Sequence, residues 1–498
     1  MERTTNRRMV TIAMMVAILL VALDTTIVST AMPRIVTDLK GLNLFSWVFA
    51  IYTLTTAVTT PIYGKLSDLF GRKRVFVIGV ALFVIGSMLS GAAQNMPQLV
   101  WFRAFQGIGA GAVFPVTFTI IGDLFPGEQR AKMQGVFSSV WGIAGLLGPL
   151  VGGLFVDNIS WRWIFYINLP VGIVSILLVL AFLHEKFDKR DHKIDYWGAA
   201  VFTIGISSLL YALLSGGSTY AWNSPVTYTL FIGSAVFIGL FIYIESKVKE
   251  PMLPLSLFGI HVIAVSNIVG FVASFVLIGV NVYLPMWIQI LLGHNAVSSG
   301  LTLMPMSIAW PLGSTLSGRY MYKIGSKTTA VFGSILVVAG SAWLLAVTLH
   351  SPYWYFVGIM VVIGLGMGYT TTPITVLIQS AVGWNMRGAA TASSTFTRTL
   401  GQTVGVAVFG SLLNNSLAHY VASHSAPGVH IGNISGMLTA GSTAHLPPQV
   451  LKIIQGGLSG GLHLIFVVGF VVAILTFLSA VVLPTHSKVM AQQPQVEN

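Results

Sequence analysis

One acidic residue stands in the middle of a long apolar run of the sequence. Asp24 lies within the run 9–31, whereas the remaining Asp and Glu residues fall in predicted loops and tails. A charged Asp at the centre of a helix in lipid costs about 2.5–3.5 kcal/mol on insertion scales. Such an acid normally faces a cavity and has a partner, and its chemistry is the binding and release of a proton or a cation.

Arg103 is the predicted partner of Asp24. Asp24 lies about 7 residues, or ~10 Å, from the end of its apolar run, and Arg103 lies about 6 residues, or ~9 Å, from the end of its own run on the same side. Because the depths agree, we expect the two side chains to face each other or to share a water. A proton and a cationic compound that compete for this carboxylate would give antiport. The alternative is a permanent structural ion pair.

The composition indicates that lipid is the main solvent of the chain. Of 498 residues, 55% are hydrophobic and only 8% are charged, with a mean hydropathy of +0.82. Soluble domains carry about 25% charged residues. These values exclude a soluble enzyme, a disordered protein and a coiled coil. The absence of cysteine from the sequence excludes disulfides, thiolate metal sites and a cysteine nucleophile, and we expect no metal and no cofactor.

The apolar runs predict an all-α integral membrane protein. A helix that crosses ~30 Å of hydrocarbon needs about 20 apolar residues. The ninth run contains Pro285, so we expect it to kink or to end early. The fourteen runs are 9–31, 45–63, 75–93, 97–121, 134–156, 164–183, 196–214, 226–244, 261–290, 299–317, 328–348, 353–378, 392–413 and 461–483.

The distribution of cations predicts the orientation. With an even number of spans, 20 Lys and Arg residues fall on the side of the two termini and 4 on the other side. The positive-inside rule then places both termini in the cytoplasm of a cell-membrane protein. The net charge of +12 has the same explanation. No basic patch is interleaved with aromatic residues, so we expect no nucleic-acid partner.

Two segments of the sequence resemble each other at an offset of 254 residues. They are 64–74, between the second and third spans, and 318–328, between the tenth and eleventh. Arg130 and Arg387 form a weaker echo at an offset of 257. Spans 1–6 are therefore predicted to repeat as spans 9–14, as two parallel six-helix bundles. The expected domains are 1–184, two inserted helices in 185–258, and 259–498 with an extracellular loop at 414–459.

Five motifs resemble those of the major facilitator superfamily, and within it the fourteen-helix drug:proton antiporter family. The motifs are 23–28 with 31–33; 64–74; Arg103, Gln106, Gly107 and Gly109; 148–153; and 161–170. The resemblance implies the major facilitator fold and multidrug efflux. It also implies that span 5 carries an antiporter motif that allows close packing and a bend, formed by Gly145, Gly148, Pro149, Gly152 and Gly153.

The same resemblance implies a cytoplasmic gate. A charge network, helped by a helix N-terminus, would lock the outward-open state. The alternative is a set of solvated loop charges. The gate residues are Gly64, Asp68, Gly71, Arg72 and Asp123.

A cavity for lipophilic compounds needs an apolar wall with a few polar groups. Aromatic faces attract organic cations, and Met adapts to varied shapes. For each candidate residue taken alone, packing in the core or against lipid is a simpler interpretation than a place in the cavity wall. For Arg398 the simpler interpretation is snorkelling to the cytoplasm, and binding of a substrate anion is the alternative. The candidates are Tyr52, Phe114, Trp141, Asn281, Trp287, Gln289, Met304, Trp310, Tyr369 and Arg398.

Together these features predict a monomeric, proton-coupled secondary transporter that exports lipophilic, often cationic drugs. Its partners are the small-molecule substrate, protons and the lipid bilayer. An exporter of one metabolite, such as an amino acid derivative or a siderophore, is an alternative on the same fold. A non-transporting sensor is a second alternative, and no pattern of an enzyme is evident.

Overall fold

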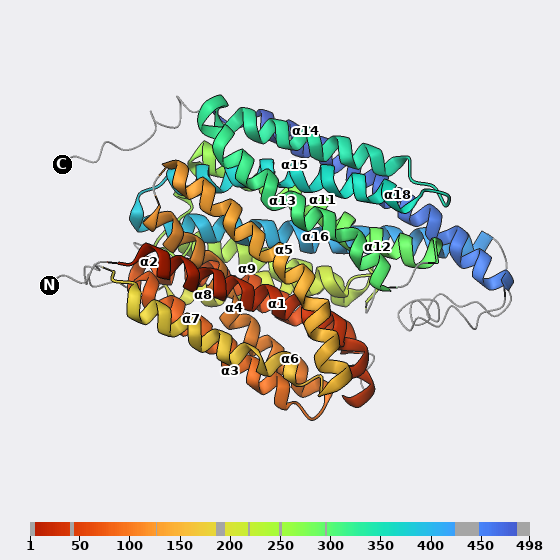
Figure 1. The fold of residues 1–498 in the computed structure, drawn as a ribbon, viewed down its shortest axis with the longest axis horizontal. Coiled ribbons are helices and arrows are strands. Elements are labelled where there is room, and N and C mark those ends of the chain that lie inside the picture. Colours follow the sequence, from red (N-terminus) through yellow and green to blue (C-terminus); the bar gives the residue numbers. More distant parts are fainter. Residues whose placement is uncertain are drawn as a thin grey trace.

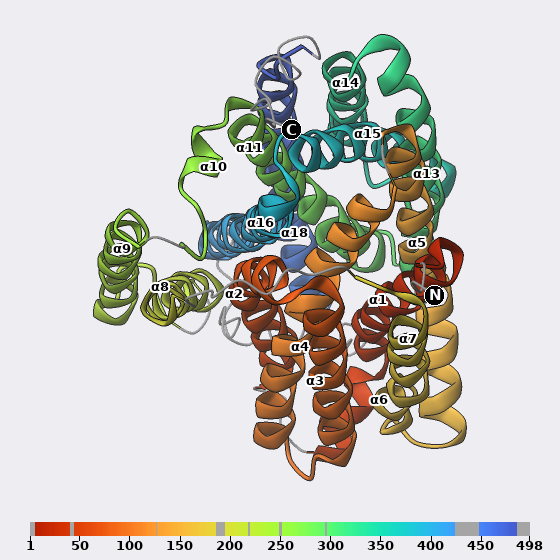
Figure 2. The same cartoon turned by 90° about the vertical axis from the view of Figure 1, so that its left-hand side faces the viewer.

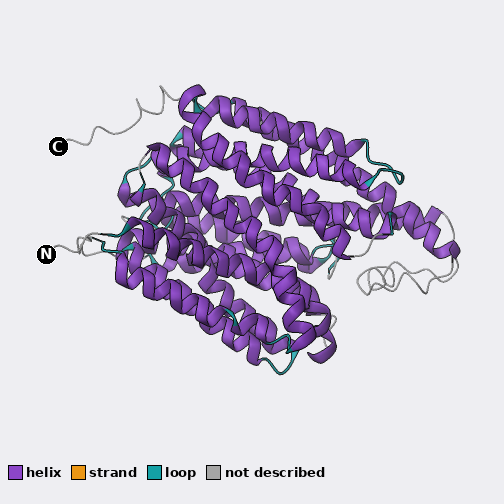
Figure 3. Cartoon of the chain, viewed as in Figure 1, coloured by secondary structure: helices purple, strands orange, loops and turns teal. Residues whose placement is uncertain are grey.

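Long helices make up nearly all of the described chain (Figures 1 and 3). The structure is a computed structural model that describes residues 5–39, 44–125, 127–185, 195–217, 220–248, 251–293, 296–423 and 448–485. The first seven helices are α1 (Arg7–Leu39), α2 (Phe45–Phe70), α3 (Arg72–Ala92), α4 (Met96–Leu124), α5 (Gly127–Asn158), α6 (Trp163–Tyr166) and α7 (Asn168–Phe182). The others are α8 (Tyr196–Ser215), α9 (Pro225–Glu245), α10 (Ser256–Gly259), α11 (His261–Ile278), α12 (Leu284–Met286), α13 (Ala296–Ile324), α14 (Ser326–Leu345), α15 (Tyr353–Ser380), α16 (Arg387–Ser423) and α18 (Pro448–Val481).

Ten helical segments within the described residues are long and apolar enough to cross a membrane. The predicted runs outside these ten fall in α2, α5, α13 and α16. These four helices pack in pairs, α5 on α13 and α2 on α16.

The helices form two groups that differ in chain position (Figure 2). Helices α1–α7 gather on one side and α11–α18 on the other, while α8 and α9 lie at the margin, with α8 against α2 and α16. We call the end of the molecule where α2 meets α3 and α13 meets α14 the basic end. It is the end that the sequence predicts to be cytoplasmic.

The two similar segments of the sequence share one backbone turn. Gly71 separates α2 from α3 with φ 91° and ψ 143°, and Gly325 separates α13 from α14 with φ 93° and ψ 148°. Both lie in the left-handed region that favours glycine. The segment 64–74 was expected as a loop, and this is wrong: α2 continues to Phe70 and α3 begins at Arg72. One glycine of positive φ is enough to reverse the chain between two helices.

The ninth run does not end at Pro285. After α11, the chain continues through the π-helical segment η2 (Gly279–Tyr283), α12 and a second π-helical segment η3 (Trp287–Leu291). Wider turns accommodate a proline that lacks an N–H donor.

The region 414–459 is also more helical than expected. Helix α16 extends to Ser423 and α18 begins at Pro448. The rest of the predicted extracellular loop, 424–447, lies outside the described residues.

The glycines of the antiporter motif differ in what they contact. Gly145 on α5 faces Ser307 on α13, and an added Cβ there would lie 3.5 Å from the Ser307 Oγ. A Cβ on Gly148 would overlap the side chain of Thr26 on α1. A Cβ on Gly153 would meet nothing within 4 Å. Gly152 is buried, and the side chain of Pro149 lies outside the described parts.

Alanine substitution at two of these glycines should therefore have opposite effects. Gly148→Ala is expected to destabilise the fold by about 1–3 kcal/mol, because the methyl group forces α1 and α5 apart. Gly153→Ala is expected to be neutral or stabilising by up to about 1 kcal/mol, because alanine is the better helix former. Thermal unfolding in detergent, followed by tryptophan fluorescence, measures both. Equal midpoints for the two variants would contradict these contacts.

Candidate functional site

Asp24 and Arg103 meet in a polar cluster between α1, α4 and α7. Arg103 Nη1 lies 2.6 Å from Asp24 Oδ2. The same nitrogen donates to Gln106 Oε1 at 2.8 Å, and Gln106 Nε2 donates to Asp24 Oδ1 at 2.8 Å. Asn168 Nδ2 donates to the same oxygen at 3.3 Å. Both carboxylate oxygens are thus hydrogen-bonded, which a buried charge requires.

This cluster is closed to solvent in the present conformation. Asp24 and Arg103 are 0% exposed. The guanidinium carbon of Arg103 lies 4.1 Å from the ring centroid of Tyr52 on α2, which covers it as a cation–π contact. The hydroxyl of Tyr52 has no hydrogen-bond partner among the described residues. Neither a proton nor a cargo molecule can reach Asp24 unless the helices move, so the interpretation as a permanent ion pair stays open.

A second polar site joins the two helix groups at the basic end. Asp68, near the end of α2, accepts hydrogen bonds from the backbone N–H groups of Gly388 at 3.0 Å and Ala389 at 2.8 Å. These N–H groups belong to the first turn of α16, where the helix dipole favours a negative charge. Arg72 Nη2 lies 2.7 Å from Asp68 Oδ1. Burial raises the pKa of Asp68, while Arg72 and the two N–H groups lower it.

Arg72 extends this contact to further elements. Its Nη2 donates to the carbonyl of Trp384 at 2.8 Å, and its guanidinium carbon lies 3.9 Å from the Trp384 ring centroid. Its Nε donates to Asp123 Oδ2 at 3.1 Å, and the other oxygen of Asp123 pairs with Arg387. We call Asp68, Arg72, Asp123, Trp384 and Arg387 the basic-end network.

Gly64 brings α2 and α16 into contact beside this network. A Cβ on Gly64 would overlap Ala392 and would lie 2.8 Å from the carbonyl oxygen of Gly388. The close approach allows the carboxylate of Asp68 to reach the N-terminus of α16. All five predicted gate residues thus lie at this contact or, as Gly71 does, at the turn beside it.

Sequence reasoning did not assign Trp384, Arg387 or Arg130 to this region. Arg130 on α5 and Arg387 on α16 both donate to the carbonyl of Gly122, at 2.7 Å and 3.4 Å. The offset of 257 residues, which relates these two arginines, was the available signal. Trp384 had no such signal, because its role depends on a short 3-10 turn, η4 (Trp384–Met386), before α16.

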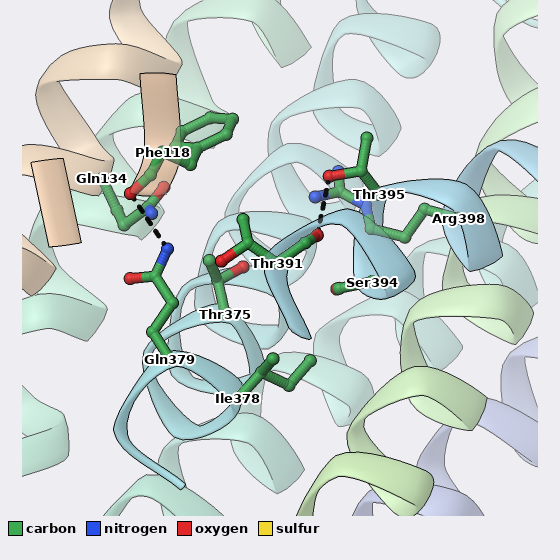
Figure 4. A pocket seen from close by; sticks show the side chains of 9 residues that line it. All are labelled: Phe118, Gln134, Thr375, Ile378, Gln379, Thr391, Ser394, Thr395 and Arg398. Atoms are coloured by element: carbon green, nitrogen blue, oxygen red, sulfur yellow. Dashed lines mark hydrogen bonds between the residues drawn. The ribbon is translucent and has the colours of Figure 1, made fainter. Parts of the chain in front are cut away.

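A cavity of about 30 Å³ lies between the helix groups, lined by residues of α4, α5, α15 and α16 (Figure 4). It contains one of the predicted substrate residues, Arg398, which is half-buried. The lining residues are Phe118, Gln134, Thr375, Ile378, Gln379, Thr391, Ser394, Thr395 and Arg398.

The structure does not gather the other predicted substrate residues around that cavity. Trp287 is 2% exposed and packs on Phe466 of α18, and Tyr369 packs edge-on against Phe332 of α14. Phe114 stacks on Trp141, with ring centroids 5.6 Å apart.

The remaining candidates are dispersed. Tyr52 belongs to the Asp24 cluster. Asn281 lies in η2, and its side-chain Oδ1 has no hydrogen-bond partner among the described residues. Met304 and Trp310 are half-buried on α13, and the side chain of Gln289 lies outside the described parts. Helical periodicity alone does not tell which face of a helix borders a cavity.

A bundle of apolar helices with buried polar centres defines a multi-pass membrane protein. The family model of the Major Facilitator Superfamily matches residues 14–406, and the chain belongs to this superfamily. It is 35% identical to "Multidrug resistance protein 3" of Bacillus subtilis over 95% of both chains. It is 38% identical to "Multidrug transporter protein MdtP" of the same organism over 83% of this chain and 76% of that protein.

The fold comparison agrees with the family. The proton:xylose symporter XylE, solved with 6-bromo-6-deoxy-D-glucose, superimposes with a TM-score of 0.65 at 16% identity, over 98% of each chain. The protein is therefore a transporter and not an enzyme.

Loss of the Asp68 carboxylate should open the basic end. Asp68→Ala leaves two N–H groups and Arg72 without their acceptor, so the helix groups should separate more readily. The chain has no cysteine, so Ser394→Cys in the cavity provides a single labelling site. The rate of maleimide labelling at this site is expected to rise at least fivefold in Asp68→Ala.

Glu185 offers a matched control at the same end. It also accepts two consecutive backbone N–H bonds, from Arg72 at 2.9 Å and Lys73 at 3.1 Å, but these lie at the N-terminus of α3 within one helix group. Glu185→Ala should leave the labelling rate unchanged. Equal acceleration by both variants would show that Asp68 does not hold the two groups together.

Proposed function

We propose that this protein is a proton-coupled antiporter that exports lipophilic, mostly cationic drugs across the cell membrane and so confers resistance to antibiotics. The observation that carries the proposal is the acid Asp24, buried with Arg103 in a helix that is apolar enough to span a membrane. The multidrug transporters among its relatives support the substrate class.

Alternating access would connect this acid with the basic-end network. In the conformation described here the network joins the two helix groups, which suits a state closed to the cytoplasm. Release of Asp68 from the N-terminus of α16 would allow the groups to separate at this end. A movement that opens the Asp24 cluster would then let a proton and a cargo molecule bind its carboxylate in turn.

The proposal includes an arrangement in the membrane. We propose fourteen crossings, with α2, α5, α13 and α16 added to the ten apolar segments, and with both termini in the cytoplasm. Residues 1–184 and 259–498 would form two related six-helix bundles, with two inserted helices in 185–258. The shared turn at Gly71 and Gly325 supports the repeat. The protein would act as a monomer.

Drug-induced proton release from purified protein tests the role of Asp24. Asp24→Asn is expected to reduce proton release, and efflux driven by a pH gradient, at least tenfold. The reason is that the amide of Asn binds no proton in the physiological pH range. Asp38→Asn provides the matched control, since Asp38 is an exposed acid near the C-terminal end of the same helix. This control should behave as the wild type.

A double variant separates coupling from stability. Asp24→Asn alone leaves Arg103 buried without a counter-charge, which costs about 3–5 kcal/mol. In Asp24→Asn with Arg103→Gln both charges are gone, and the protein is expected to fold but to lack proton coupling. Restored pH-driven efflux in the double variant would leave the pair with a structural role only.

A further inference from the structure

Arg398 is a cation within the helix bundle that has no counter-charge among the described residues. No described residue forms an ion pair or a hydrogen bond with its side chain. The sequence contains no Asp or Glu between Glu250 and Glu497. The two acids of the basic-end network, Asp68 and Asp123, are already paired with Arg72 and Arg387.

Arg103 is the other cation inside a predicted span, and its surroundings differ from those of Arg398. Its guanidinium is completely buried, touches a carboxylate and an amide, and lies on an aromatic ring. Arg398 is half-buried, and its side chain lines a cavity. A charged side chain at membrane depth without a partner in the protein marks a site for something that is bound.

The other polar groups of the cavity complement this cation. Gln134 is 7% exposed and its Nε2 has no hydrogen-bond partner among the described residues. Gln379 is 0% exposed; its Nε2 donates to the carbonyl of Phe118 at 3.2 Å, and its Oε1 has no partner in the described chain. Two side chains from opposite helix groups, Gln134 and Arg398, therefore present unused N–H donors to one space (Figure 4).

The size of the cavity limits what can enter in this conformation. A water needs about 10–15 Å³ by this measure. A cavity of about 30 Å³ thus has room for two oxygen atoms, which is the polar end of a carboxylate or a similar small oxyanion. A whole drug molecule needs several hundred Å³. The cavity is accordingly one polar subsite of the space that opens when the helix groups separate.

We propose that Arg398 binds a carboxylate or another anionic group of the transported compound, with the Gln134 amide as a second donor. The guanidinium presents its donors in a planar fork that matches two carboxylate oxygens. This inference rests on the proposed function and extends its substrate class, because zwitterionic and acidic amphiphiles become cargo beside lipophilic cations. The subsite and Asp24 would select opposite charges on one molecule.

Two dyes that differ only at a carboxyl group provide the test. Rhodamine 110 has a free carboxylate, and rhodamine 123 is its methyl ester. Binding to the purified protein is measured by fluorescence anisotropy, and export is measured in proteoliposomes. Arg398→Gln is expected to raise the Kd for rhodamine 110 at least tenfold and to change the Kd for rhodamine 123 less than threefold. Arg398→Lys should retain part of the affinity for rhodamine 110, since lysine keeps the positive charge.

Arg319 provides the matched control, because it is an exposed arginine at the basic end. Arg319→Gln removes the same charge and should leave both Kd values unchanged. Rhodamine 123 is the internal control for folding in every variant. A loss of affinity for both dyes in Arg398→Gln, or for neither, would overturn the proposal.

Replacement of chloride by gluconate at constant ionic strength distinguishes a cargo group from a free anion. If the anionic group belongs to the cargo, chloride should compete with rhodamine 110 and not with rhodamine 123. A requirement of both dyes for chloride that disappears in Arg398→Gln would assign the site to a free anion and overturn its assignment to cargo. Binding of both dyes without export of either would refute the proposed transport and leave the subsite intact.

Discussion

A buried charge requires a partner, and this constraint determines where the polar centres of the protein lie. Asp24 and Arg103 neutralise each other, and Gln106 and Asn168 supply the remaining hydrogen bonds. Removal of either charge alone would leave the other in a medium of low dielectric constant. The pair consequently holds α1, α4 and α7 in register, and any movement that exposes Asp24 must provide a new partner for Arg103.

The same constraint makes the two helix groups unequal. The first group contains both the Asp24 pair and the acids of the basic-end network, whereas the sequence after Glu250 contains no acid until Glu497. The second group therefore contributes helix N-terminal N–H groups, Arg387 and the unpaired Arg398. Attraction between the groups depends on acids from one side and on N–H donors and cations from the other.

Close packing allows these charges to meet. Gly64 lets α2 approach α16 closely enough for Asp68 to reach two backbone N–H groups. Gly142 lets α5 approach α13, because a Cβ there would overlap the carbonyl oxygen of Ser307. The four helices that form these contacts are paired across the two helix groups, α2 with α16 and α5 with α13.

Sequence alone indicated the matching depths of Asp24 and Arg103 and the similarity of segments 64–74 and 318–328. The depth follows from a rise of 1.5 Å per residue, which places Asp24 and Arg103 at the same level in any pair of helices that cross the same apolar layer. The glycine turns at Gly71 and Gly325 were not predicted, since 64–74 was expected as a loop, and only the structure showed them. The α-helical class followed from the long apolar runs.

Only the tertiary structure decided the rotation and the neighbours of each helix. It buried Asp24 and placed Tyr52 over its partner Arg103. It also brought Trp384 to Arg72 across more than 300 residues of sequence and placed Arg398 in the lining of a cavity. The dispersal of the predicted aromatic cavity residues has the same cause. Periodicity defines the faces of a helix, but packing against other helices decides which face meets lipid, core or cavity.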